Sequence, residues 1–135
     1  MPLPAPPPLG TAMLPQDTYA GQVVVVTGGG TGLGKAMAVE FARLGAAVAI
    51  ASRKTEHREN GVHAVESVGA RAIGVELDVR DEAAVAAMFD AVERQLGPAD
   101  VLINNAAGNF PSQAIKLSAN AWRAVVDIVL NGTFL

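Results

Sequence analysis

A glycine-dense stretch between a run of valines and an amphipathic helical pattern constrains the fold of this chain most. Residues 27–34 read Thr-Gly-Gly-Gly-Thr-Gly-Leu-Gly and directly follow Val23–Val26. A turn from a buried strand into a helix gathers free N–H groups and the positive end of the helix dipole, which favours a bound phosphate. Glycine lets the backbone approach such a ligand closely. An ordinary glycine turn is the alternative, but the legible strand and helix favour a dinucleotide site.

The spacing of these glycines narrows the motif. The common G-x-G-x-x-G fingerprint does not fit, because a start at Gly28 or Gly30 meets Leu33 or Lys35 at its last position. The pattern that fits is T-G-x-x-x-G-x-G, which begins at Thr27 and ends at Gly34.

Short apolar runs alternate with helical patterns along the rest of the chain. Runs that are apolar on both faces are typical of strands in a parallel sheet covered by helices. The predicted strands are Val23–Val26, Ala46–Ala51, Ala72–Leu77 and Val101–Ile103. The predicted helices are Leu33–Leu44, about Thr55–Val68, Asp81–Leu96 and a last one that begins near Ser118 or Asn120 and runs to the chain end. With right-handed crossovers this order predicts an α/β, Rossmann-type doubly wound parallel sheet of strand order 3-2-1-4.

Ligands of such sheets bind at the carboxyl ends of the strands, where the strand order reverses. The two stretches expected there are Thr27–Gly34, after the first strand, and Asn104–Phe110, after the fourth. The second reads Asn-Asn-Ala-Ala-Gly-Asn-Phe, and its small residues would let a cofactor pass close to the backbone. An ordinary turn is again the alternative. His57 and His63 are expected on the second helix, away from this crevice, and we assign them no role.

The end of the second strand bears on cofactor choice. Sites for NAD usually have a carboxylate there, about 20 residues beyond the glycines. This chain has Ser52, Arg53 and Lys54 instead. Arginine can bind a 2′-phosphate with two hydrogen bonds, so these residues favour NADPH over NADH. A solvated pair of surface cations is the alternative. The third strand ends at Asp78, which could accept a hydrogen bond from an adenine amino group or simply begin the next helix.

Composition limits the remaining possibilities. The 135 residues carry a net charge of −3 and no cysteine, which gives no electrostatic case for nucleic acid or membrane partners and excludes thiol chemistry. The first cation is Lys35, and no apolar run reaches the roughly 20 residues of a membrane span. We therefore expect a cytoplasmic protein without signal or transit peptide. Residues 1–14 are predicted to be a disordered, proline-rich tail, with a true start at Met13 or a PxxP ligand as alternatives, and residues 15–135 the folded unit.

Together these residues resemble the short-chain dehydrogenase/reductase family. The matching motifs are Thr27-Gly28-x-x-x-Gly32-x-Gly34, Asp78, the Asn104-Asn105 loop and the helix asparagine Asn131. Four further features are similar to the 2,4-dienoyl-CoA reductase branch. They are the extra alanine in the loop, Leu117-Ser118-x-x-Ala-Trp, Asp-Ile-Val-Leu-Asn-Gly-Thr at residues 127–133, and Ala-Ser-Arg-Lys at residues 51–54. The resemblance runs from about Tyr19 to Leu135. On its own, Asn131 would be a solvent-facing or locally bonded residue.

The resemblance implies NADPH as cofactor and an acyl-CoA substrate, reduced by hydride delivery to a conjugated dienoyl-CoA in unsaturated fatty acid degradation. The cofactor-binding residues implied by family and sequence are Gly28, Gly29, Gly30, Thr31, Gly32, Leu33, Ser52, Arg53, Lys54, Asp78, Val79, Asn104 and Ala106. The implied substrate-binding residues are Arg80, Phe110 and Ser118. Asn131 would support the catalytic hydrogen-bond network, no metal is implied, and the family suggests a homotetramer.

The chain departs from the family where the catalytic helix is expected. The family needs a Tyr-x-x-x-Lys segment after its fifth strand, whereas this chain ends at Leu135 and its one tyrosine is Tyr19. We therefore expect a domain truncated before strands 5–7: an N-terminal fragment, poorly soluble or molten in isolation and without reductase activity. Two alternatives stay open. One is a short-chain enzyme acting on ketones or alcohols, and the other is a non-catalytic nucleotide-binding module.

Overall fold

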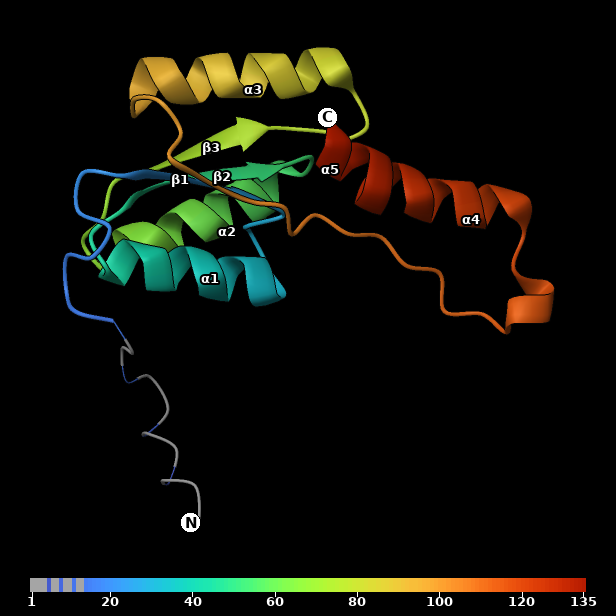
Figure 1. Ribbon diagram of the computed structural model, residues 1–135, viewed down its shortest axis with the longest axis horizontal. Helices are drawn as coiled ribbons and strands as arrows, with labels where there is room; N and C mark the ends of the chain where they lie inside the picture. The colour runs from blue at the N-terminus through green and yellow to red at the C-terminus, as the bar shows by residue number, and fades with distance from the viewer. Residues whose placement is uncertain (1–4, 6–7, 9–10, 12–13) are drawn as a thin grey trace.

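The computed structural model describes residues 5, 8, 11 and 14–135 and shows a parallel sheet with helices on both faces (Figure 1). The strands are β1 (Val23–Thr27), β2 (Ala47–Ser52), β3 (Ala72–Glu76) and β4 (Val101–Ile103), and the helices between them are α1 (Gly32–Arg43), α2 (Thr55–Glu66) and α3 (Glu82–Gln95). The sheet order is β3-β2-β1-β4, with all pairs parallel. The predicted α/β fold and strand order are confirmed. Most of the predicted tail, residues 1–14, lies outside the described residues.

Strand β1 supplies side chains to two separate hydrophobic cores. Val24 and Val26 pack with β2 beneath α1 and α2, whereas Val23 and Val25 pack toward α3. Val25 lies opposite Ala49 of β2 and Leu102 of β4. Because side chains alternate between the faces of a strand, the unbroken valine run corresponds to a strand covered on both sides. All four valines are buried.

The buried face of α1 is lined by its smallest residues. Gly34, Ala38 and Ala42 are buried, at spacings of one helical turn. The larger apolar residues spaced along the helix are less buried: Met37 and Phe41 are half-buried, and Leu33, at the start, is 80% exposed. Small side chains allow the helix to lie close to the sheet. The spacing of the larger apolar residues therefore located α1 in the sequence but did not identify the face that contacts the sheet.

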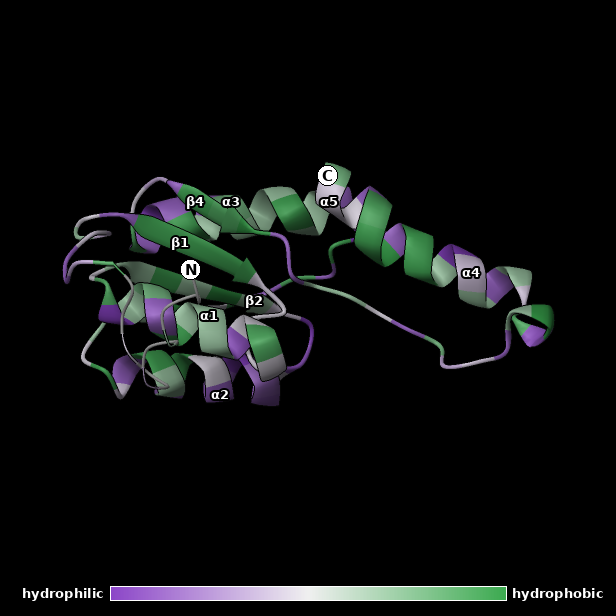
Figure 2. Ribbon diagram, turned by 60° about the horizontal axis from the view of Figure 1, so that its bottom comes forward, coloured by the Kyte–Doolittle hydropathy of each residue, from purple (hydrophilic) through white to green (hydrophobic). Residues whose placement is uncertain are grey.

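The chain after β4 stands away from the sheet, as both views of the ribbon show (Figures 1 and 2). We call residues 104–135 the C-terminal arm. It comprises an extended stretch with a short 3-10 turn, Ala114–Lys116, then α4 (Ala119–Val126), a π-helical turn at Asp127–Asn131, and α5 (Gly132–Phe134). No residue of α4 is buried. Apolar side chains are nevertheless prominent on the arm, with Trp122 61% and Phe134 87% exposed.

Two further observations complete the fold. Strand β4 pairs only with β1 and forms one edge of the sheet, as predicted, and Leu102 at its centre is 42% exposed. Within residues 5, 8, 11 and 14–135, every helix is too short or too polar to cross a bilayer.

Candidate functional site

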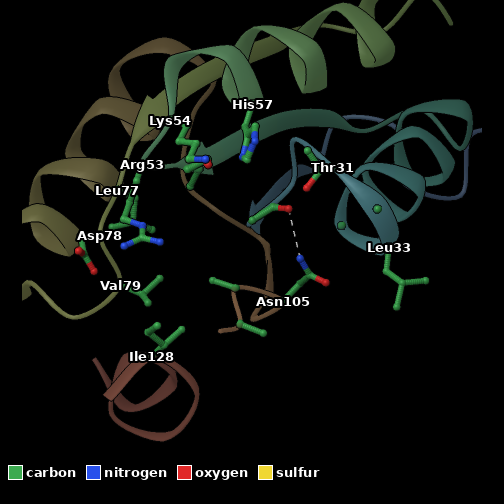
Figure 3. A pocket seen from close by; sticks show the side chains of 17 residues that line it. Thr31, Leu33, Arg53, Lys54, His57, Leu77, Asp78, Val79, Asn105 and Ile128 are labelled. Carbon is green, nitrogen blue, oxygen red and sulfur yellow. Dashed lines mark hydrogen bonds between the residues drawn. The ribbon is translucent and has the colours of Figure 1, made fainter. Parts of the chain in front are cut away.

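A pocket of about 410 Å³ opens at the carboxyl ends of β1, β2 and β3. It lies at the point where the strand order reverses, between β1 and β4, the position expected for a ligand of a doubly wound sheet. Its lining comes from the glycine turn, the ends of β2 and β3, the start of α2, and the C-terminal arm (Figure 3). The lining residues are Gly28, Thr31, Gly32, Leu33, Gly34, Ala51, Ser52, Arg53, Lys54, His57, Leu77, Asp78, Val79, Asn105, Ala106, Ala107 and Ile128.

Hydrogen bonds between Thr27 and Asn105 join the glycine turn to the end of β4. The buried Thr27 hydroxyl accepts from the main-chain N–H groups of Asn105 and Ala106, at 3.0 and 2.9 Å. The Asn105 amide donates back to the carbonyl oxygens of Thr27 (2.9 Å) and Gly28 (3.3 Å). The two stretches predicted to meet therefore do so, through direct contacts at one corner of the pocket.

Gly34 shows how closely the start of α1 approaches this corner. A Cβ on Gly34 would lie 2.4 Å from the Asn105 amide nitrogen and 2.5 Å from the Gly28 carbonyl oxygen. No side chain fits in that gap. The glycine spacing of the motif thus allows helix α1 to begin directly against the turn, with its N-terminal N–H groups beside the pocket.

The helices that begin at the pocket differ from the others in their capping. Neither α1, after Thr31, nor α2, after Lys54, has a side-chain hydrogen bond at its N-cap. In contrast, Asp81 caps α3 and Ser118 caps α4 by accepting from main-chain N–H groups. Helix N-termini without a side-chain acceptor can donate to an anion. Two of the four long helices present such ends at the pocket wall.

The pocket also contains two cationic side chains, Arg53 and Lys54, at the carboxyl end of β2 (Figure 3). Among the described residues, neither side chain has a hydrogen-bond or salt-bridge partner, and both are exposed. The predicted carboxylate-free end of β2 therefore faces the pocket, where its charges remain available to an anion.

Asp78 and Arg80, at the end of β3, are bound to each other. The Arg80 guanidinium donates two hydrogen bonds to the Asp78 carboxylate, at 2.9 and 2.6 Å, and the Arg80 main-chain N–H adds a third at 3.1 Å. The Arg80 hydrogen bonds hold the pKa of Asp78 near 2, below its usual 3.8, and the pKa of Arg80 is raised in turn by Asp78. Asp78 lines the pocket as an ionised acceptor, and Arg80 does not line it.

His57 is the clearest correction to the sequence-based expectation. It was placed away from the crevice, yet it lines the pocket, and its ring points inward beside Lys54 (Figure 3). The reason is a close approach between α2 and the glycine turn. A Cβ on Gly30 would lie 2.0 Å from the His57 carbonyl oxygen. His63, by contrast, is exposed.

Three predicted cofactor residues lie outside the lining. Gly29 and Gly30 are buried and turn toward β2 and α2: a Cβ on Gly29 would contact Val26 and Ile50, and Gly30 accepts a 2.6 Å hydrogen bond from Asn60. Asn104 is exposed at the end of β4, and its neighbour Asn105 lines the pocket instead. The other predicted cofactor residues all lie in the lining.

The predicted substrate and catalytic residues of the C-terminal arm are not gathered at the pocket. Phe110 is 49% exposed, Ser118 caps α4 by accepting from Ala121, and the Asn131 amide donates to the Asp127 carboxylate at 2.9 Å. Of the helical part of the C-terminal arm, only Ile128 lines the pocket (Figure 3).

Asn105 and Ala107 lie within the stretch Asn104–Phe110 that the sequence places at the crevice, but they were given no role of their own. Ala51, His57, Leu77 and Ile128 were missed as lining residues. The sequence did indicate Asn105, because it adjoins the predicted Asn104. Side chains alternate between the two faces of a strand, so only one of the two asparagines faces the pocket, and the residue at which the strand ends decides which one. His57 could have been found from the packing of Gly30 on α2, which requires coordinates. Ile128 follows from the path of the arm, which no local pattern indicates.

Comparisons with known proteins agree with this geometry. The sequence model of the family described as short chain dehydrogenase matches residues 22–135. An uncharacterized oxidoreductase of Caenorhabditis elegans is 49% identical over 129 residues, which are 94% of this chain and 41% of the relative. A peroxisomal 2,4-dienoyl-CoA reductase of Arabidopsis thaliana is 41% identical over 87% of this chain and 40% of its own length.

A solved structure gives the same picture. A short chain dehydrogenase from Bacillus anthracis superposes with a TM-score of 0.79 at 43% identity, over 84% of this chain and 47% of that one. The chain thus spans less than half the length of each of these three proteins.

Proposed function

The chain belongs to the short-chain dehydrogenase family, and we propose that it is the cofactor-binding part, residues 15–135, of an NADPH-dependent reductase of 2,4-dienoyl-CoA thioesters. Membership implies an oxidoreductase that uses a nicotinamide nucleotide. The choice of NADPH, the thioester substrate and the role in unsaturated fatty acid degradation are our proposals.

One observation carries the cofactor proposal: the pocket wall at the end of β2 has two cations without a partner among the described residues and no carboxylate. Arg53 and Lys54 would hold a 2′-phosphate, and Ser52 would add a hydroxyl. The ionised Asp78 would accept from the adenine amino group, with Val79 beside it. The turn also suits a pyrophosphate, because Gly34 lets α1 begin directly against the turn and α1 has no side-chain cap on its N-terminal N–H groups.

The remaining assignments extend this arrangement. Gly28, Thr31, Gly32 and Leu33 would donate main-chain N–H groups to the pyrophosphate, while Gly29 and Gly30 would support the turn through packing. Asn104 and Ala106 are proposed along the ribose path. Phe110, Ser118 and Arg80 are proposed contacts of the acyl-CoA, and Asn131 a part of the catalytic hydrogen-bond network. Bound NADPH supplies a hydride for the conjugated double bond.

The proposed substrate rests on relatives, of which the Arabidopsis thaliana protein is named a 2,4-dienoyl-CoA reductase. We propose further that these 135 residues bind cofactor without turning over substrate. Their one tyrosine, Tyr19, packs edge-on against Phe41 at a ring distance of 4.8 Å, beneath α1 and outside the pocket lining. We also propose a homotetramer in the cytoplasm; the exposed apolar side chains of α4, such as Trp122, are suited to a subunit contact.

A binding experiment tests the cofactor proposal. We expect the chain to bind NADPH at least about tenfold more tightly than NADH in calorimetric titrations, because the 2′-phosphate gains charge-assisted hydrogen bonds worth about 1.5–3 kcal/mol each. Replacing Arg53 and Lys54 together by alanine should remove the preference. Arg43→Ala is the matched control, since Arg43 pairs with Glu40 on α1, outside the pocket lining. Equal affinity of the wild-type chain for both nucleotides would contradict the proposal.

An activity assay tests the substrate proposal. We expect the 135-residue chain to leave NADPH unoxidised in the presence of 2,4-hexadienoyl-CoA. A longer product of the same gene that includes a Tyr-x-x-x-Lys segment should oxidise NADPH with this thioester and not with simple ketones. Preference for a ketone or alcohol would instead support another short-chain enzyme. If the 135-residue chain, tested without a Tyr-x-x-x-Lys segment, shows a cooperative thermal transition that NADPH shifts, the result would support a binding module.

A further inference from the structure

Arg58, on the second turn of α2, is bonded to the main chain at the end of β2. Its guanidinium nitrogen Nη1 donates to the carbonyl oxygens of Ser52 and Arg53, both at 2.9 Å. Nη2 donates to the Thr55 hydroxyl at 3.0 Å. These three acceptors belong to the strand end, the turn and the start of the helix, so one side chain ties together the whole segment that carries Arg53 and Lys54.

The Arg58 side chain is held in place by its surroundings. It is 14% exposed, and a 3.6 Å ion pair links it to Glu76, whose side chain is 79% exposed. A Cβ on Gly74 of β3 would lie 3.1 Å from the Arg58 Cβ. Gly74 thus leaves room for the Arg58 stem to cross β3, which accounts for a glycine inside that strand.

Arg58 differs from the neighbouring cations in how its hydrogen-bonding capacity is used. Among the described residues, the side chains of Arg53 and Lys54 have no partner, whereas Arg58 has three hydrogen-bond acceptors and an ion pair with Glu76, and Arg80 is bound to Asp78. Within that same part of the chain, Arg58 is the one donor to the Arg53 carbonyl oxygen. The peptide from which the Arg53 side chain departs is therefore fixed by Arg58.

We propose that Arg58 is a positioning residue that fixes the main chain at Ser52 and Arg53, so that Arg53 meets the 2′-phosphate of the adenosine and the pocket selects a 2′-phosphorylated nucleotide. The inference rests on the proposed function, because it assigns the basis of that cofactor preference. A fixed donor loses less conformational entropy when it binds an anion than a mobile one does.

The rest of the pocket does not depend on Arg58. The glycine turn is held by Asn105 and Thr27, and α2 is separately attached to that turn by the 2.6 Å hydrogen bond from Asn60 to Gly30. The pyrophosphate and adenine contacts should therefore survive its loss. Removing Arg58 should weaken NADPH binding and leave NADH binding nearly unchanged, which a general structural role would not produce.

The test uses calorimetric titration of the 135-residue chain with NADPH and with NADH. Arg58→Met removes the three hydrogen bonds and keeps the apolar stem, and Arg58→Lys restores the positive charge on a side chain that can donate hydrogen bonds. We expect Arg58→Met to lower the NADPH-to-NADH affinity ratio about tenfold, the equivalent of roughly one charge-assisted hydrogen bond, and Arg58→Lys to lower it less. Arg71→Met is the matched control, because Arg71 also donates to a main-chain carbonyl, that of Gln95, but lies outside the pocket.

A double mutant separates positioning from direct contact. If Arg58 acts through Arg53, the variant Arg53→Ala/Arg58→Met should lose no more preference than Arg53→Ala alone. Additive losses would show that Arg58 contacts the phosphate itself and would overturn the inference. An Arg58→Met chain that keeps the wild-type ratio, or that loses both nucleotides equally with an altered circular dichroism spectrum, would overturn it as well while leaving the cofactor proposal intact. A wild-type chain without preference would overturn both.

Discussion

The β-α units from β1 to α3 and the C-terminal arm are built from similarly apolar residues, yet only the first region buries them. In the first region strands β1 and β2 are covered on both faces and the large buried side chains form two cores. In the arm, residues 104–135, large apolar side chains such as Trp122 and Phe134 are 61% and 87% exposed. Secondary structure alone therefore does not distinguish the regions, because both contain regular helices.

The difference teaches where the pocket obtains its rigidity. Nearly all pocket-lining residues belong to the region from β1 to α3 or to the start of the arm, which is bonded to that region through Thr27 and Asn105. Ile128 is the one lining residue from the helical part of the arm. The groups proposed to bind an anion are thus placed on elements fixed by two cores, whereas two of the three predicted substrate contacts, Phe110 and Ser118, lie on the arm. We expect cofactor binding to be less sensitive than substrate binding to changes in the arm.

The largest effect should come from matched truncations of one residue type in the two regions. Ile50→Ala removes a fully buried side chain of β2, and Ile115→Ala removes one that is 93% exposed on the arm. We expect losses in the free energy of unfolding of about 3 kcal/mol for the first and under about 0.5 kcal/mol for the second, measured by urea denaturation. Similar losses at both positions would break the comparison and indicate that the arm packs against other residues.

A second pair of variants tests the connection between the regions. Thr27→Val keeps the shape of a buried side chain but leaves the N–H groups of Asn105 and Ala106 without their hydroxyl acceptor. We expect a cost of about 2 kcal/mol and weaker nucleotide binding. Thr133→Val removes an exposed hydroxyl that donates to Val129 within the arm and should cost under about 0.5 kcal/mol. A Thr27→Val chain with wild-type stability would show that β4 is held by its strand pairing alone.

The N-caps of α3 and α4 offer a smaller and sharper contrast. Asp81 and Ser118 each accept one main-chain hydrogen bond at 3.1 Å, and replacing either by alanine should cost its helix about 1 kcal/mol. Helix α3 buries Met88 and Val92, so Asp81→Ala should lower the urea midpoint of the whole chain. Ser118→Ala should only accelerate amide hydrogen exchange within α4. Equal shifts of the global midpoint would mean that the arm unfolds together with the sheet.

The smallest effect concerns acid stability at the end of β3. Because hydrogen bonds from Arg80 lower the pKa of Asp78 from 3.8 to about 2, this carboxylate stabilises the folded state fully above pH 3.8, and the contribution is lost as the pH falls through about 2. Asp78→Asn should remove that part of the pH dependence from urea midpoints measured between pH 4 and 2. Asp90→Asn changes the same charge on α3 without breaking an ion pair, and should retain the wild-type slope.

The sequence predicted the fold well because its signals were local and repeated. Strands β1 and β2 are runs of mostly buried residues. Gly45, Gly69 and Gly97, which follow the first three helices, adopt positive φ, as expected for glycine at helix ends. Most residues of the glycine turn and the cations at the end of β2 line the pocket, and their role in cofactor binding stays a prediction. The local sequence pattern was enough to place these residues, because each of them directly follows a strand that the pattern identifies.

The rest depended on contacts between elements. The contact face of α1 could not be predicted, because small residues permit a close approach without producing an apolar signal. His57 reaches the pocket only because Gly30 lets α2 pack against the turn, and the arm follows a path that no periodicity encodes. The roles proposed for Phe110, Ser118 and Asn131 stay predictions for the same reason.

The four consecutive valines of β1 carry one more consequence, which concerns slippage of the strand. If β1 slid by two residues, valines would again face both cores. If it slid by one residue, the two cores would exchange identical side chains, whereas in most strands a slide by one residue buries the wrong face. What differs along the strand are its ends. At one end Asp100 accepts from the Val23 N–H at 2.8 Å and donates to its carbonyl oxygen at 2.9 Å, and at the other Thr27 binds the residues after β4. Polar contacts at the two ends, rather than hydrophobic burial, therefore select one alignment among several that the valines alone would leave nearly equal in energy.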